Sequence, residues 1–306
     1  GRDGSPLWQW KKNVRPDDWV DFRLDRNGDA LVSGIQGGTP YVCKRSGRDG
    51  SLVWERREAL DLFQRSLQMD PEDNLIVLGD FGGRCIVRRY SGKTGDRLWE
   101  FRATRRARDL SVLPGPRGLA FTPGGDLILV GTTWSGTGSE SDVSSVYLAR
   151  LILSTGLARW ESWDERGMRR GEQVAVDSHG DVVATGYAQL RGLFGVSEFF
   201  VTKYDGMSGA PAWDQLYGTD NQTDDYARAL RIRPDGDIVV HGWRNVNPIA
   251  WQLVTLRLSG ATGRVQSQVR DPGSWYLSPS IYGRSWLMSF GPGGCLAIAG
   301  SDQPNS

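Results

Sequence analysis

The chain has 306 residues, with 37 basic and 36 acidic side chains, 40 glycines and 13 tryptophans. A formal net charge of +1 excludes a protein that binds nucleic acid through bulk positive charge. No apolar stretch approaches the roughly 18–20 residues of a membrane-spanning helix. Three cysteines without CxxC spacing argue against a disulfide framework or a zinc knuckle.

A glycine followed four residues later by a tryptophan recurs along the chain. Successive tryptophans are 46, 45, 61 and 53 residues apart, a period typical of a propeller blade rather than of a helical hairpin. A sixth copy has Ser267 in the tryptophan position. We expect the tryptophans to pack between neighbouring blades as structural residues. The repeat residues are Gly4, Trp8, Gly50, Trp54, Gly95, Trp99, Gly156, Trp160, Gly209, Trp213 and Gly263.

In chain order, residues 1–10 begin in an outer strand that carries Trp8, and full repeats follow. Each repeat opens with two apolar residues at period two, such as Phe22 and Leu24, which predicts a first strand. A tight Asn/Asp/Gly hairpin then leads to a second strand that ends in glycine, at Gly34 in the first repeat. A third strand follows a variable loop, and the fourth begins near the repeat tryptophan. The chain is therefore predicted to be all-β.

The two ends of the chain predict how the repeats close. The chain ends just after a second strand, CLAIAG (295–300). We therefore expect one domain over residues 1–306, a six-bladed β-propeller of four antiparallel strands per blade, with one blade assembled from both termini. That blade is one strand short. Three explanations fit. The blade has only three strands, further sequence precedes Gly1, or a partner adds a strand by β-augmentation. We favour further sequence before Gly1.

Parts of the repeats resemble known families. AWDQLYGTDNQTDDYARALRIRPDGDIVVHGW (212–243) resembles the bacterial β-propeller repeat of secreted and surface proteins (SBBP-like), whereas SGKTGDRLWEF (91–101) and LSTGLARWES (153–162) resemble quinoprotein (PQQ-type) repeats. The resemblance implies a propeller in a periplasmic, surface or secreted protein. It does not imply a bound quinone, because the Asp usual four residues before the repeat glycine is present only as Asp205. We expect no cofactor.

The variable loops indicate where a site would lie. Loops between second and third strands, and links between repeats, vary in length and emerge on the same face of a four-stranded blade. We name this the loop-side face. Aromatic residues there would suit a sugar ring or an apolar anchor of a partner, unless they cap gaps between blades. The candidates are Trp134, Trp243, Trp275, Tyr276 and Tyr282.

Arginines are also frequent in the links between repeats. Converging guanidinium groups could bind an anionic ligand or an acidic protein surface through charge-assisted hydrogen bonds. The alternative is that they form ion pairs with acidic neighbours such as Asp164. The candidates are Arg102, Arg105, Arg106, Arg169 and Arg170.

Signals for catalysis and metal binding are weak. His179 lies in a tight hairpin and His241 inside a strand, and neither has a partner at triad or metal-ligand spacing. Asp220, Asp224 and Asp225 could coordinate calcium through oxygen ligands, but they could equally form Asx turns.

Three functions from different classes fit the sequence. We favour a non-catalytic scaffold or interaction module that binds a protein partner through the loop-side face or the incomplete blade, in an extracytoplasmic assembly. The first alternative is a module whose aromatic loops bind carbohydrate or a cell-surface polymer. The second is an enzyme with carboxylates that meet at the channel mouth. A propeller fold alone does not decide among them.

Overall fold

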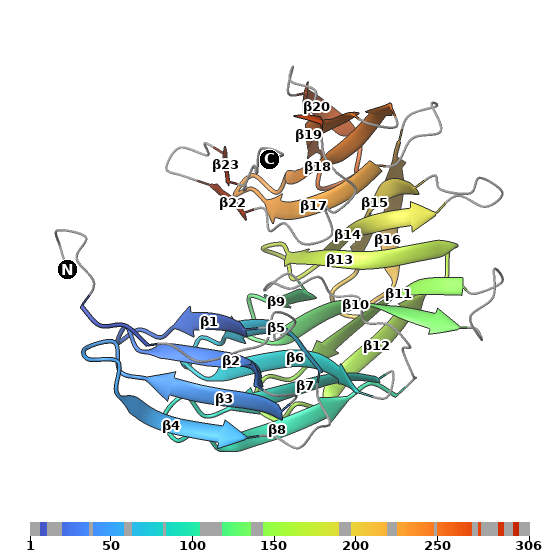
Figure 1. Ribbon diagram of the computed structural model, residues 1–306. Helices are drawn as coiled ribbons and strands as arrows, with labels where there is room; N and C mark the ends of the chain where they lie inside the picture. Colours follow the sequence, from blue (N-terminus) through green and yellow to red (C-terminus); the bar gives the residue numbers. More distant parts are fainter. Residues whose placement is uncertain are drawn as a thin grey trace. The chain divides into compact units, whose positions relative to one another are not determined.

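The protein is built from antiparallel sheets. The computed structural model describes residues 7–10, 20–36, 39–57, 63–81, 84–104, 118–135, 143–189, 197–218, 225–247, 250–270, 275–276, 287–290 and 296–299. Their strands form five sheets, each built on four consecutive strands, and a two-stranded hairpin (Figure 1). None of the described segments forms a helix long and apolar enough to cross a membrane.

Five sheets follow one another along the chain. Sheet 1 contains β1 (Val20–Leu24), β2 (Ala30–Gln36), β3 (Thr39–Arg45) and β4 (Leu52–Arg57). Sheet 2 contains β5 (Phe63–Met69), β6 (Leu75–Phe81), β7 (Arg84–Tyr90) and β8 (Arg97–Arg102). Sheet 3 contains β9 (Leu119–Phe121), β10 (Leu127–Ser135), β11 (Val143–Leu151) and β12 (Ala158–Asp164).

Sheet 4 contains β13 (Met168–Val176), β14 (Val182–Gln189), β15 (Ser197–Tyr204) and β16 (Pro211–Tyr217). Sheet 5 contains β17 (Asp225–Ile232), β18 (Ile238–Asn247), β19 (Ala250–Leu258) and β20 (Val265–Arg270), and the short strand β21 (Trp275–Tyr276) pairs with β19. The hairpin consists of β22 (Leu287–Phe290) and β23 (Leu296–Ala299).

The chain divides into two compact units. Unit 1 is Gly1–Pro116 with Ile152–Ala158, and unit 2 is Arg117–Leu151 with Arg159–Ser306. Sheets 1 and 2 belong to unit 1. Sheets 3 to 5 belong to unit 2, with one exception. The segment Ile152–Ala158, which forms the turn between β11 and β12 and includes the first residue of β12, belongs to unit 1.

The order of the strands within each sheet follows the chain. The predicted all-β architecture of four-stranded antiparallel repeats is therefore confirmed for the five sheets. Residues 7–10, predicted within an outer strand, are an exception, because among the described residues this segment is not part of a strand. A strand needs a paired neighbour, and among the described residues no strand pairs with this segment.

Each repeat tryptophan lies on the turn that precedes the fourth strand of the following repeat. The indole Nε1 of Trp54 donates a hydrogen bond to the Gly92 carbonyl oxygen at 3.2 Å. The ring lies so close to Gly95 that a Cβ there would be 2.6 Å from Trp54 Cε3. Gly95 also has φ of +74°, a conformation that glycine adopts at little cost. The same two contacts join Trp8 to Gly47 and Gly50, Trp99 to Leu153 and Gly156, Trp160 to Gly206 and Gly209, and Trp213 to Gly260 and Gly263.

A second repeated contact holds the two tight hairpins together at one end of each sheet, which we name the hairpin end. A cation six residues before the repeat glycine binds a carboxylate of the hairpin between the first and second strands. In sheets 1, 2 and 4 the acid stands nine residues before the second-strand glycine, and in sheets 3 and 5 it stands five residues before it. The pairs are Lys44–Asp25, Arg89–Asp70, Arg150–Asp126, Lys203–Asp177 and Arg257–Asp237, with N–O distances of 2.7–2.8 Å.

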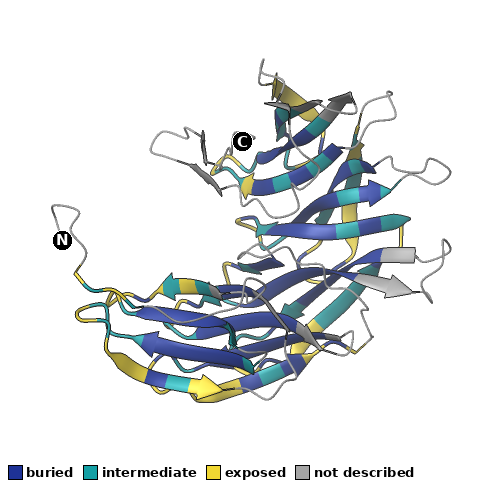
Figure 2. Ribbon diagram, viewed as in Figure 1, coloured by how far each residue is buried: buried dark blue, intermediate teal, exposed yellow. Residues whose placement is uncertain are grey.

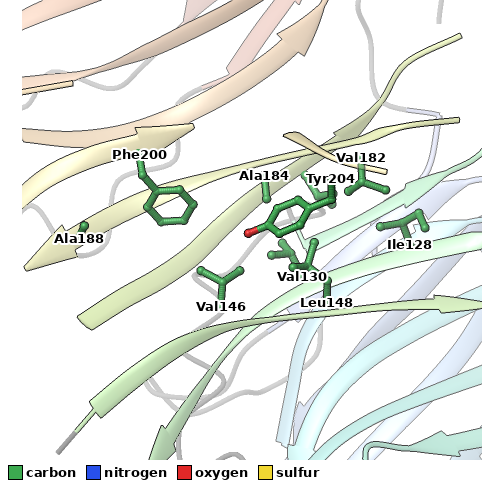
Figure 3. Close-up of a cluster of buried hydrophobic side chains, with 10 residues drawn as sticks. Ile128, Val130, Val146, Leu148, Val182, Ala184, Ala188, Phe200 and Tyr204 are labelled. Atoms are coloured by element: carbon green, nitrogen blue, oxygen red, sulfur yellow. The ribbon is translucent and has the colours of Figure 1, made fainter. Parts of the chain in front are cut away.

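Apolar cores lie between neighbouring sheets of the same unit. In unit 2, Val130 and Leu148 of sheet 3 pack with Val182, Phe200 and Tyr204 of sheet 4 (Figure 3). The inner strands are accordingly buried on both faces, whereas all six residues of β20 are exposed (Figure 2). This pattern follows from packing neighbouring sheets of a unit face to face and leaving the fourth strand at the solvent edge.

The tryptophan contact predicts a large local contribution to stability. Replacing Trp54, which is buried, by Ala should lower the free energy of unfolding in urea by about 3–5 kcal/mol, because it empties the space over Gly95 and removes the indole hydrogen bond. Leu52→Ala on the same strand is the control, because Leu52 is exposed, and it should change that free energy by less than about 0.5 kcal/mol. Equal small effects of the two substitutions would contradict the assignment.

Candidate binding site on the loop-side face

The structure pairs two of the arginines proposed for ligand binding with acidic side chains. Arg102 is the last residue of β8 rather than part of a link, and its Nε donates to Glu100 Oε1 at 2.5 Å. Glu100 also accepts from Arg88 and Arg97. Burial raises the pKa of Glu100, but the hydrogen bonds from Arg88 and Arg102 outweigh burial and lower it overall. Arg102 therefore belongs to an ion-pair network.

Arg169, predicted as an arginine of a link between repeats, is instead a buried residue of a strand. It lies in β13 and is buried, and its Nη1 and Nη2 donate to the two carboxylate oxygens of Asp214 at 2.6 and 2.8 Å. Burial raises the pKa of Asp214, but the hydrogen bonds from Arg169 and Thr202 more than offset this and keep the carboxylate ionised. Arg169 is thus buried in an ion pair with Asp214, as the alternative interpretation of these arginines expects. Arg105 and Arg106 lie outside the described residues.

Of the five aromatic candidates predicted from the sequence, the structure describes the side chain of Trp243. Trp243 is only 5% exposed, because β18 continues past Gly242 and holds it within the sheet, so it is not an exposed loop residue. Trp134 lies within β10, and Trp275 and Tyr276 form β21; the side chains of these three residues lie outside the described part, as does the whole of Tyr282. The predicted start of the loops at Trp134 and Trp243 was therefore too early.

The acidic segment proposed for calcium is described only in part. Asp225 opens β17 and is 3% exposed, whereas Asp220 and Asp224 lie outside the described residues. Within the described ranges, no group of three or more His, Cys, Asp or Glu side chains is arranged to hold a metal ion.

Two β-bulges place charged side chains at the loop-side end of unit 2. In β13 the register shifts between Gly171 and Gln173, which makes Glu172 the extra residue. In β17 Arg228 is the extra residue in the same way. A bulge interrupts the alternation of a strand and redirects the side chain at that point. The two bulge residues meet between sheets 4 and 5, with Arg228 Nη1 3.3 Å from Glu172 Oε2.

The second-strand glycines make room for these bulges. A Cβ on Gly186 would lie 1.8 Å from the Arg170 carbonyl oxygen, and one on Gly242 would lie 2.3 Å from that of Tyr226. Each glycine follows its bulge residue by 14 positions (186 − 172 and 242 − 228). In sheets 4 and 5 the second-strand glycine therefore has a physical role, because a larger residue would collide with the bulged strand.

Aromatic and basic side chains surround the bulge pair and form what we name the Arg–Tyr cluster: Arg170, Glu172, Tyr187, Tyr226 and Arg228. The rings of Tyr187 and Tyr226 meet edge to face, with centroids 5.1 Å apart. The guanidinium of Arg170 lies 5.6 Å from the Tyr187 ring centroid, and that of Arg228 lies 5.4 Å from the Tyr226 centroid. The Arg–Tyr cluster is thus formed by side chains of β13 and β14 in sheet 4 and of β17 in sheet 5.

The residues of the cluster are buried or half-buried. The side chains of Glu172 and Arg228 are 6% and 11% exposed, whereas Arg170, Tyr187 and Tyr226 are half-buried. Glu172 and Arg228 thus form a largely buried ion pair beside the ring of Tyr226. Of these five residues, only Arg170 is among the candidates predicted from the sequence. The 14-residue spacing before the second-strand glycine was the available signal for the other charged positions.

Comparison with known proteins identifies the fold. No family model matches the chain, and no curated protein matches it in sequence. Its structure is similar to the Dos1 propeller, with a TM-score of 0.56 and 13% identity, over 92% of this chain and 68% of that one. It is also similar to the α-L-arabinanase of Penicillium chrysogenum complexed with arabinobiose (TM-score 0.53, 11% identity, 79% and 75% of the two chains).

A weaker match is the quinohemoprotein alcohol dehydrogenase ADHIIG of Pseudomonas putida HK5, with a TM-score of 0.48 and 10% identity, over 87% of this chain and 62% of that one. At such identities the likeness concerns the fold alone. The chain has a β-propeller fold with repeated four-stranded blades, without assignment to a family.

His241, which pairs with Ala229 beside the bulge in β17, predicts a pH dependence of stability. Burial lowers its pKa to about 4 from an ordinary value of 6.5, and its Nδ1 lies 2.9 Å from Thr255 Oγ1. Below pH 6.5 the unfolded chain binds a proton that the folded chain does not, so stability falls as the pH decreases toward 4. Between pH 7.5 and 5 this loss should be about 2 kcal/mol.

Urea unfolding at several pH values measures this loss. The His241→Gln variant should lose about 2 kcal/mol less than the wild type over that range. His179→Gln is the matched control, because His179 is exposed on a hairpin, and it should retain the wild-type dependence. Identical pH profiles for all three proteins would show that His241 does not titrate as described.

Proposed function

We propose that the chain is a non-catalytic β-propeller module that binds a partner protein through its loop-side face, in an extracytoplasmic assembly. The observation that carries the proposal is the Arg–Tyr cluster. Tyrosine and arginine are the residues most enriched, with tryptophan, among those that dominate protein–protein binding energies. Here they are half-buried and held by neighbours, so little conformational entropy is lost when a partner binds.

The state of the carboxyl groups favours binding over catalysis. A general acid, as in glycoside cleavage, needs a carboxyl group whose pKa is raised toward neutrality. Among the described residues, every carboxyl group with a shifted pKa is shifted downward, including Glu100, Asp164 and Asp214. Burial raises the pKa of each of these three, but hydrogen bonds from arginine and other side chains outweigh it. These carboxylates stabilise ion pairs and stay ionised at neutral pH.

The aromatic side chains favour a protein partner over a carbohydrate. Stacking on a sugar ring requires an open aromatic face. Trp243 is buried, and guanidinium groups lie over the rings of Tyr187 and Tyr226. A guanidinium group therefore occupies one face of each tyrosine ring, which leaves less open aromatic surface for a sugar.

Affinity capture from an extract of the source tests the proposal, with captured proteins and glycans quantified in parallel. We expect one protein to be retained at a stoichiometric amount by the wild type and to be lost with Arg170→Glu. His179→Glu is the control, because His179 lies on a hairpin at the opposite end of sheet 4. Retention of that protein by the Arg170→Glu variant, or capture of glycan without protein, would contradict the proposal.

We also propose that the ring has six blades and that residues near the N-terminus supply the outer strand of the last one. Trp8 supports this closure, because it contacts Gly47 and Gly50 as each fourth-strand tryptophan contacts the turn of the next repeat. The hairpin of β22 and β23 would provide the first and second strands of the same blade.

Closure predicts a specific cross-link. Lys11 and Lys12 follow the outer strand and Asp302 follows the second strand, so both segments would leave the blade at the loop-side end. Two strand spacings are about 10 Å. A carbodiimide that couples lysine to carboxylate should join Lys11 or Lys12 to Asp302, as read by peptide mass spectrometry. Cross-links of these lysines exclusively to acidic residues of sheet 1 would contradict closure.

A further inference from the structure

Met207 is the most exposed large apolar side chain among the described residues, at 79%, and it lies on the turn between β15 and β16. The carbonyl oxygen of the preceding residue, Gly206, accepts a hydrogen bond from Trp160 Nε1 at 3.1 Å. The tryptophan contact itself does not require a methionine at this position. The corresponding residues of the other four turns are Arg48, Lys93, Ser154 and Ala261.

The guanidinium of Arg150, a residue of β11 in sheet 3, lies beside the sulfur of Met207. Its Nη1 donates to the Gly206 carbonyl oxygen at 2.7 Å and lies 3.8 Å from Met207 Sδ. Its Nε donates to Asp126 Oδ2 at 2.8 Å, and the Arg150 side chain is only 13% exposed. Hydrogen bonds at two of its nitrogens thus hold the guanidinium in place, so its position does not depend on Met207.

This thioether combines access to solvent with a neighbouring hydrogen-bond donor. Peroxides convert an accessible methionine to its sulfoxide. The sulfur lone pair attacks one oxygen of hydrogen peroxide, the O–O bond breaks as the S–O bond forms, and the peroxide is reduced to water. The methionine thereby loses two electrons and gains a polar oxygen. Because a thioether sulfur is only a weak acceptor, oxidation gives Arg150 a stronger partner than it has in the reduced chain.

We propose that Met207 is a site of reversible oxidation by peroxide, at which the guanidinium of Arg150 binds the sulfoxide oxygen. With the sulfur 3.8 Å from Nη1, rotation of the Met207 side chain brings an oxygen bonded to it within hydrogen-bond distance. This charge-assisted hydrogen bond joins the turn of sheet 4 more firmly to β11 of sheet 3.

The exposure of Met207 determines the sign of the effect on stability. Oxidation of a buried methionine disrupts an apolar core, because it places a polar sulfoxide there. Met207 is exposed, so its oxidation adds a hydrogen bond without that loss. Reduction by a methionine sulfoxide reductase restores the thioether. The inference is independent of the proposed function, because these residues lie at the hairpin end rather than in the Arg–Tyr cluster.

Peptide mass spectrometry of the folded chain, after timed exposure to hydrogen peroxide, tests the selectivity of oxidation. We expect Met207 to be oxidised at least about fivefold faster than Met69 and Met168, which are half-buried, because the rate follows access to the sulfur. Oxidation of all three methionines at one rate would overturn the assignment of a site at Met207.

The melting temperature before and after the same treatment tests the contact with Arg150. Oxidation should raise the wild-type Tm by about 1–2 °C, and treatment with the reductase should reverse the rise. Met207→Leu is the matched control, because it removes the sulfur and keeps an apolar side chain, so its Tm reports what oxidation of the other methionines does. We expect no rise in this variant.

Arg150→Gln separates the hydrogen bond from other effects of the sulfoxide. Each variant is compared with its own untreated form, so the loss of the ion pair between Arg150 and Asp126 cancels. The rise should be absent from Arg150→Gln. Equal changes of Tm in the wild type and Met207→Leu, or a rise that persists in Arg150→Gln, would overturn the inference.

Discussion

The stacking of an indole on a left-handed glycine is the contact on which the architecture depends. Five tryptophans each cover a glycine with φ between +71° and +74°, and each donates its N–H to the carbonyl three residues earlier. Each Trp–Gly contact thus combines burial of the indole ring, a hydrogen bond, and a position under the ring with no room for a Cβ. The distance between consecutive repeats is fixed there, so the apolar faces of neighbouring sheets can pack at native density.

The two ends of each sheet are specialised by different interactions. At the hairpin end, an ion pair in every sheet joins the third strand to the first hairpin, and sheets 3 and 5 keep the pair although the acid has moved four positions along the hairpin. At the loop-side end of sheets 4 and 5, bulges opposite Gly186 and Gly242 direct Glu172 and Arg228 toward each other. A rigid end therefore supports an end where side chains can be arranged for binding.

Much of the fold could be predicted from the sequence, because period-two apolar residues and the Gly–Trp spacing are local signals that the structure preserves. The candidate site could not be predicted as well. Trp243 was placed in a loop because its second strand was taken to end at the repeat glycine, whereas β18 runs on to Asn247. The burial of Arg169 depends on Asp214, 45 residues later in the chain. The contact between Tyr187 and Tyr226 likewise joins two sheets, and no pattern within one repeat reveals it.

A double-mutant cycle between Trp160 and Gly209 measures the energetic coupling between the indole ring and the glycine that it covers. In the wild type a Cβ on Gly209 would lie 2.8 Å from Trp160 Cε3, and the residue has φ of +71°. In the wild type, Gly209→Ala should therefore lower the free energy of unfolding through both a steric clash and backbone strain. In a Trp160→Leu background only the backbone strain should lower it. We predict that the loss of unfolding free energy caused by Gly209→Ala, measured by urea unfolding, is smaller by about 1 kcal/mol or more in that background. Equal costs in the two backgrounds would show that the ring and the glycine are not coupled.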